Sequence, residues 1–95
     1  MVEIHIRMKV RDFDVFWQGF QERGAPLRAR HGSKGAKVYR SQDDPAGVLL
    51  LLTWESRERF AQFLQDPEVQ DSMVRGGVIG RPDIVHVEPV GELPA

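Results

Sequence analysis

The chain has 95 residues, of which 41% are hydrophobic and 28% are charged, with a formal net charge of −1 at pH 7. This is one domain's worth of globular chain, and its absence of cysteine excludes disulfides, thiolate zinc sites and cysteine nucleophiles. The near-neutral charge, the short apolar runs and the missing export leader predict a cytoplasmic protein without nucleic-acid or membrane partners.

The first third of the chain predicts a strand followed by a broken helix. Residues 2–10 alternate between apolar and polar side chains, which is typical of a strand with one face on a core. Asp12 is placed to cap a helix whose aromatic residues follow helical spacing: Phe13, Phe16, Trp17 and Phe20. Gly24 and Pro26 interrupt this helix, and a second short helical segment is expected to end at Gly32.

The middle of the chain predicts two strands joined by a turn. A strand is expected at residues 36–40, and residues 41–47 are rich in turn formers. Residues 48–54 are apolar at nearly every position, which predicts a strand in the middle of the sheet, covered on both faces.

The last third predicts two helices and a final strand. Ser56 is placed to cap a helix with inward residues Phe60, Phe63 and Leu64. Asp66 and Pro67 start a further short helix that ends near Arg75. A loop then leads to a strand at residues 83–90, and the tail at residues 91–95 is expected to be loose.

The order βαββαβ predicts an α+β fold of the ferredoxin-like type over residues 1–95. Right-handed crossovers place both helical regions on one face of a four-stranded antiparallel sheet, with the first and third strands central. The other face carries apolar side chains from the third strand but has no helix over it. An exposed apolar face of this kind usually marks an interface, so we expect a homodimer packed sheet to sheet.

The order and spacing of several short motifs resemble those of small dimeric α+β-barrel proteins of the antibiotic-biosynthesis-monooxygenase type and their cyclase-like relatives. These motifs are Val10-x-Asp12-Phe13-x3-Trp17, Arg30-His31-Gly32, Lys37-Val38-Tyr39-Arg40, Asp44-Pro45, Trp54-Glu55-Ser56, Phe60-x2-Phe63 and Met73-x2-Gly76-Gly77-Val78-x-Gly80-x-Pro82. The resemblance covers nearly the whole chain and implies a ligand pocket between the helices and the sheet of each subunit.

Two functional hypotheses follow. In the first, the protein binds a small hydrophobic molecule, aromatic or polyketide-like, and acts as a monooxygenase or cyclase without a protein-held cofactor. Such oxygenation relies on the substrate's own carbanion to reduce oxygen, so the site needs only a base and a dry cavity. In the second, the chain is a non-catalytic homodimeric module that binds a metabolite or a protein.

His31 is the candidate catalytic residue. It follows the broken helix just before Gly32, where helix and sheet should separate, and imidazole titrates near neutrality. The alternative interpretation is a histidine favoured at a helix C-terminus by the macrodipole.

The candidate residues of the ligand pocket are aromatic or apolar: Trp17, Phe20, Tyr39, Trp54, Met73, Val78 and Ile79. A pocket of this composition suits a flat, partly polar ligand, and the indole N–H groups could position it. Most of the aromatic residues are equally explained as core.

His5 and His86 are candidate metal ligands. If the last strand pairs with the first, both histidines fall on the helix-free face, flanked by Glu3 and Glu88. Polar pairs in a sheet-to-sheet interface explain the same residues more simply, so no metal is predicted.

Basic residues are concentrated in the stretch Arg28 to Arg40, without an acid between Glu22 and Asp43: Arg28, Arg30, Lys34, Lys37 and Arg40. This stretch could hold an anionic substrate or a phosphate. Alternatively it is a solvated surface, or it pairs with acids elsewhere, such as Glu55, Glu58 or Asp66.

Overall fold

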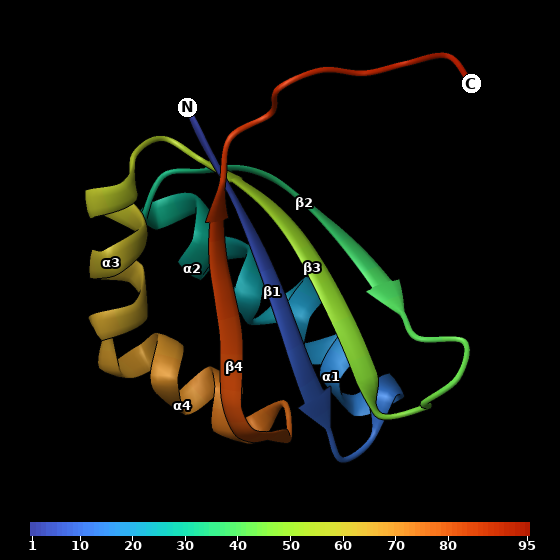
Figure 1. Cartoon of the computed structure of the whole chain (residues 1–95). Coiled ribbons are helices and arrows are strands. Elements are labelled where there is room, and N and C mark those ends of the chain that lie inside the picture. Colours follow the sequence, from blue (N-terminus) through green and yellow to red (C-terminus); the bar gives the residue numbers. More distant parts are fainter.

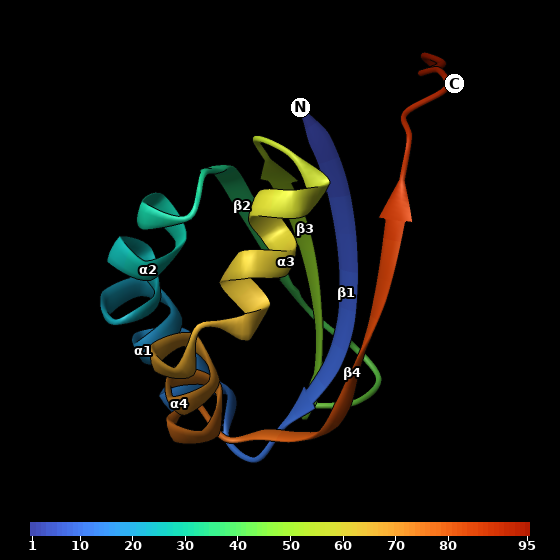
Figure 2. The same cartoon turned by 90° about the vertical axis from the view of Figure 1, so that its left-hand side faces the viewer.

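The computed structural model describes residues 1–95 and contains a four-stranded antiparallel sheet with four helices on one face (Figures 1 and 2). The elements in chain order are β1 (Val2–Val10), α1 (Phe13–Glu22), α2 (Gly24–Arg30), β2 (Ser33–Arg40), β3 (Gly47–Trp54), α3 (Arg57–Gln65), α4 (Pro67–Arg75) and β4 (Val78–Val87). The strand order is β2-β3-β1-β4, so the prediction of a ferredoxin-like α+β fold with β1 and β3 in the centre is confirmed. None of the helices is both long and apolar enough to span a membrane.

Three of the predicted helix starts, those of α1, α3 and α4, are confirmed by their capping hydrogen bonds, whereas α2 has no side-chain cap. The Asp12 carboxylate accepts from the backbone N–H groups of Asp14 and Val15, and the Ser56 hydroxyl accepts from that of Arg59. Asp66 ends α3 and also caps α4, where its carboxylate accepts from the Glu68 N–H at 2.9 Å. At the other end of α4, Gly77 adopts a positive φ of 78°, which a side-chain-bearing residue rarely adopts.

Two strands are longer at their starts than the sequence predicted. β2 begins at Ser33 rather than at residue 36, and β4 begins at Val78 rather than at residue 83. The segment expected to be a loop before β4 pairs with β1 through Val78 and Ile79, and the register then shifts. Pro82 is compatible with a strand here because β4 is at the sheet edge and needs hydrogen-bond partners on one side only.

The core lies between the helices and one face of the sheet. Its buried residues come mainly from alternate positions of the central strands, with one residue each from α1 and α3: Ile4, Ile6, Met8, Val10, Val48, Leu50, Leu52, Trp54, Phe16 and Phe60. The intervening residues face away from the helices. The prediction that β3 is covered on both faces is therefore wrong within one chain, because Leu49 points to the helix-free side and is 37% exposed.

Candidate functional site

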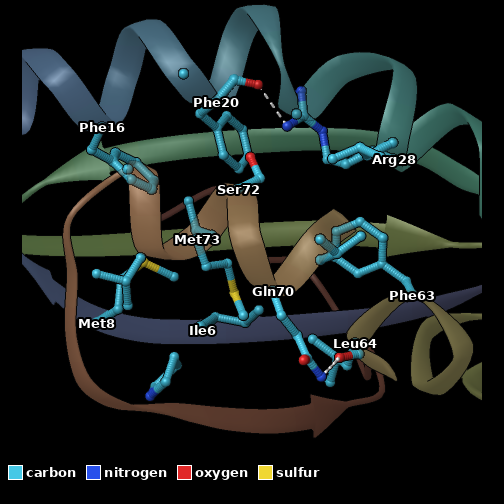
Figure 3. Close-up of a pocket in the computed structure, with 18 of the residues that line it drawn as sticks. Ile6, Met8, Phe16, Phe20, Arg28, Phe63, Leu64, Gln70, Ser72 and Met73 are labelled. Atoms are coloured by element: carbon cyan, nitrogen blue, oxygen red, sulfur yellow. Dashed lines mark hydrogen bonds between the residues drawn. The ribbon is translucent and has the colours of Figure 1, made fainter. Parts of the chain in front are cut away.

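A cavity of about 520 Å³ lies between the helical layer and the sheet (Figure 3). All four helices contribute to its wall, for example through Phe16, Arg28, Phe63 and Met73, and the sheet forms its floor. Of its 22 lining residues, 13 are hydrophobic. Sites for small molecules typically measure about 300–1,000 Å³ and are mostly apolar, so the cavity has the size and character of a ligand site.

The polar side chains of this cavity are unusual in carrying no negative charge. Three arginines contribute to the lining, Arg23, Arg28 and Arg81, together with Gln70 and Ser72. No Asp, Glu, His, Tyr or Cys takes part. The cavity therefore combines an apolar body with cationic groups and lacks the usual general bases.

Three of the seven predicted pocket residues line this cavity: Phe20, Met73 and Val78. The other four do not, and their positions correct the expectation. Trp54 is fully buried in the core below α3, where it packs against Phe60 and Phe63 and donates its indole N–H to the His31 carbonyl at 2.8 Å. Trp17 is 39% exposed and lines a separate, shallower hollow against β2.

Tyr39 and Ile79 lie on the opposite face of the sheet, because successive side chains of a strand point to alternate faces. Tyr39 pairs with Leu49, and Ile79 pairs with Lys9, so both side chains point away from the helices. Their neighbours Val38 and Val78 occupy the helix-facing positions. A shift of one residue thus decides which of two adjacent side chains reaches the cavity.

His31 ends α2 as its C-cap and lies outside the cavity wall. Its Nε2 is 2.7 Å from Oδ2 of Asp66, and its ring contacts Phe63 edge-on at 5.8 Å between centroids. Phe63 in turn lines the cavity, so one aromatic ring stands between His31 and the ligand space. Hydrogen bonding by His31, the Glu68 N–H and Arg30 lowers the pKa of Asp66 to about 2.

The prediction that His5 and His86 share the helix-free face is wrong. His86 pairs with Ile4, so it faces the helices and contacts the Phe60 ring edge-on, whereas His5 pairs with Val85 on the other face. Desolvation, with a smaller contribution from the charge of Arg57, lowers the pKa of His86. No three His, Cys, Asp or Glu side chains are grouped so that they could hold a metal ion.

The basic stretch divides into residues with different roles. Arg30 pairs with Asp66 at 2.7 Å and with Glu68 at 3.6 Å, in agreement with the alternative that this stretch pairs with acids. Lys34 and Lys37 are exposed. Arg28 instead turns into the cavity region, where its guanidinium lies 3.8 Å from the centroid of the Phe20 ring and donates to the Phe20 carbonyl at 2.7 Å.

Sequence reasoning missed Arg23, although a signal was present. Phe16, Phe20 and Arg23 follow at spacings of four and three residues, so Arg23, the C-cap residue of α1, faces the same side as the two aromatic residues. Gly19 lies on this side and leaves room for the Arg23 side chain, since a methyl group there would clash with the guanidinium.

A family model and several solved structures match this chain and its fold. The family model described as antibiotic biosynthesis monooxygenase matches residues 1–75. No curated protein sequence matches the chain. Among solved structures, SnoaB, a cofactor-independent oxygenase from Streptomyces nogalater, superposes with a TM-score of 0.78 at 18% identity, covering 99% of this chain and 97% of SnoaB.

Two further structures show the same fold. A Bordetella bronchiseptica protein of the antibiotic biosynthesis monooxygenase type gives a TM-score of 0.80 at 21% identity, covering 94% of this chain and 96% of its own. Rv0793 from Mycobacterium tuberculosis gives 0.69 at 17% identity, with 96% of each chain covered. Because the family model spans most of the chain, this protein belongs to the antibiotic biosynthesis monooxygenase family.

Proposed function

We propose that the chain binds a flat, hydrophobic aromatic or polyketide-like molecule in the cavity between helices and sheet, and oxygenates it without a protein-held cofactor. The observation that carries this proposal is the cavity itself, which is apolar, about 520 Å³ in volume and formed by residues from all four helices and the sheet. Membership of the family and the likeness to a cofactor-independent oxygenase support the reaction class.

The chemistry follows from a substrate with an acidic C–H group, such as an anthrone. Loss of a proton from the CH₂ group gives a carbanion stabilised as an enolate, which transfers electrons to O₂ and forms a hydroperoxide at that carbon. Loss of water then leaves a carbonyl, so one oxygen atom enters the product and the other leaves as water. Guanidinium groups beside the enolate oxygen would lower the pKa of the C–H group and favour the first step.

His31 is our candidate for the proton acceptor. Asp66 fixes its ring through the 2.7 Å contact, which is how a carboxylate orients a catalytic imidazole. Since Phe63 separates the imidazole from the cavity, the proposal requires this ring to turn aside or a water to connect the two. Replacing His31 by Ala should abolish turnover while leaving ligand affinity within about three-fold, and unchanged turnover would remove the assignment.

The activity is tested with anthrone under air, by following anthraquinone formation and oxygen uptake. We expect at least a ten-fold acceleration over autoxidation without added flavin or metal. The Met73→Trp variant, which fills the cavity, should return the rate to background. The Val74→Trp variant is a matched control, because Val74 is the next residue and is 71% exposed.

A second candidate function is a non-catalytic module that binds a metabolite or a protein. The observation favouring it is the absence of an Asp, Glu, His, Tyr or Cys side chain from the cavity lining. Ligand binding without any acceleration of anthrone oxidation would support this alternative over the oxygenase.

We further propose that the protein forms a homodimer through the helix-free face of the sheet. Proteins of this family are commonly dimeric. In this chain the face exposes several large apolar side chains: Tyr39, Leu49, Ile79 and Val85, each between 37% and 48% exposed. A second copy packed sheet to sheet would cover them.

A further inference from the structure

We propose that the natural ligand carries a carboxylate, and that Arg23 and Arg28 bind it at the α1–α2 end of the cavity. This inference rests on the proposed function, because it assumes that the cavity holds a small molecule. It adds the chemical class of the ligand and names the residues that select it.

The first support is a charge imbalance at the cavity wall. Arg23, Arg28 and Arg81 contribute to the lining, whereas no Asp or Glu does. Six ion pairs occur in the chain, and none of them includes Arg23, Arg28 or Arg81. Arg81 is exposed, but Arg23 and Arg28 are partly buried. Placing these two cations against apolar surface without a counter-charge is costly, so a bound anion would relieve this cost.

The second support is the number of hydrogen-bond donors that remain free on Arg23. Its Nε is buried and has no hydrogen-bond partner, and its terminal nitrogen reaches only the Ser72 carbonyl at 3.4 Å. A guanidinium has five N–H donors in a planar arrangement that matches a carboxylate. Buried donors without a partner are rare in native proteins, and here the donor belongs to a residue of the cavity wall.

The third support is the way in which Arg28 is held. Its guanidinium lies over the Phe20 ring. It also donates one hydrogen bond to the Phe20 carbonyl (Figure 3). These contacts fix the orientation of the group but leave its charge uncompensated. Burial lowers the pKa of Arg28, as expected for a cation that lacks an acidic partner.

The nearby acids are already engaged elsewhere. Arg23 also borders an outer cleft that Glu68 and Asp71 help to line. However, Asp71 pairs with Arg75 at 3.1 Å, and Glu68 lies 3.6 Å from Arg30. The charged residues of this outer cleft are three arginines and two acids, so no free acid there is left to neutralise Arg23.

Glycines next to both arginines provide space for this arrangement. A methyl group on Gly19 would clash with the Arg23 guanidinium, and one on Gly24 would clash with that of Arg28. Both guanidinium groups therefore lie close against the backbone of α1 and α2. This position leaves the apolar part of the cavity free for the body of the ligand.

The test compares two probes of nearly equal shape, anthraquinone-2-carboxylate and anthraquinone-2-carboxamide, by isothermal titration calorimetry. The wild-type protein should bind the carboxylate at least ten-fold more tightly. Arg23→Gln and Arg28→Gln should each weaken carboxylate binding by roughly ten- to a hundred-fold, the value of a charge-assisted hydrogen bond, and leave carboxamide binding within about three-fold. Arg57→Gln, an exposed arginine outside the cavity and without an ion pair, is the matched control and should change neither.

A second variant, Gly19→Ala, distinguishes a lost contact with the carboxylate from a general loss of folding. Gly19→Ala keeps both arginines and suits a helix better than glycine, but its methyl group displaces the Arg23 guanidinium. It should fold with an unchanged or higher Tm and lose part of the selectivity for the carboxylate. Unchanged selectivity in this variant and in Arg23→Gln would overturn the role of Arg23.

The outcomes separate the two proposals. Equal binding of both probes would overturn the carboxylate inference and leave the proposed function standing. Binding of neither probe would overturn both. Preference for the carboxylate that survives both Arg→Gln substitutions would mean that the anion is held elsewhere, which contradicts the inference.

Discussion

The Nε2 atom of His31 lies 2.7 Å from Oδ2 of Asp66, and this contact joins the end of α2 to the junction of α3 and α4. Asp66 serves three purposes at this point: it ends α3, caps α4 and binds both His31 and Arg30. One carboxylate therefore connects the α1–α2 half of the cavity wall to the α3–α4 half.

This connection predicts a specific pH dependence of stability. The pKa of Asp66 is lowered from 3.8 to about 2 in the folded protein, so the folded state favours the carboxylate. Its contribution to stability is then fully present above about pH 4 and is lost as the pH falls towards 2. Asp66→Asn should lower the free energy of unfolding at pH 7, and its difference from wild type should shrink towards pH 2.

Urea unfolding at pH 7, 4 and 2.5 measures this dependence. Asn is also a good N-cap residue, so the substitution removes mainly the charge. Asp71→Asn is the control, because Asp71 is an exposed carboxylate on α4, the helix that Asp66 caps. A difference between Asp66→Asn and wild type that stays constant with pH would contradict the assignment.

Trp54 is predicted to stabilise the fold rather than to contact a ligand. Its indole N–H satisfies the His31 carbonyl, so Trp54→Phe should cost about 1–3 kcal/mol through the lost hydrogen bond. Trp17→Phe, at a partly exposed position, should change stability by less than about 0.5 kcal/mol. Urea unfolding gives both values, and the affinity of Trp54→Phe for anthraquinone-2-carboxylate should match wild type.

The dimer proposal predicts that a charge on the helix-free face separates the subunits. Leu49 lies between Arg7 and Tyr39 on this face. In the Leu49→Glu variant the new carboxylate can pair with Arg7, so the monomer should remain folded. Burying this charge in the dimer should raise the dissociation constant at least about a hundred-fold. Analytical ultracentrifugation measures the change, with Val74→Glu on the outer helical layer as control. A dimer of unaltered affinity in Leu49→Glu would place the interface elsewhere.

The sequence predicted the fold well because its signals are local. Alternation in residues 2–10 and the caps Asp12, Ser56 and Asp66 each depend on residues a few positions apart. The sequence did not predict the start of β4, because this part of the strand depends on pairing with residues far away in the chain. Gly80 and Pro82 resemble a loop locally, but pairing of this segment with β1 at the sheet edge overrides that preference.

The site was predicted less completely because strand register and the orientation of each helix decide which side chains reach the cavity. Val78 reaches the cavity and Ile79 does not, and only their pairing with Val10 and Lys9 decides this. His5 and His86 were predicted to share one face because the sequence alone does not give the register of β4 against β1. Arg23 was overlooked because an arginine is usually exposed, whereas here it continues the aromatic stripe of α1.

The central claim is that the helix–sheet cavity holds a small aromatic molecule, and native mass spectrometry of the untagged protein with anthraquinone-2-carboxylate tests it most directly. We predict one ligand per protomer for wild type and for Val74→Trp, with the added mass lost on denaturation. The Met73→Trp variant, whose new side chain fills the cavity beside Ile6, should remain folded and show no added mass. Equal ligand occupancy in Met73→Trp and wild type would contradict the claim.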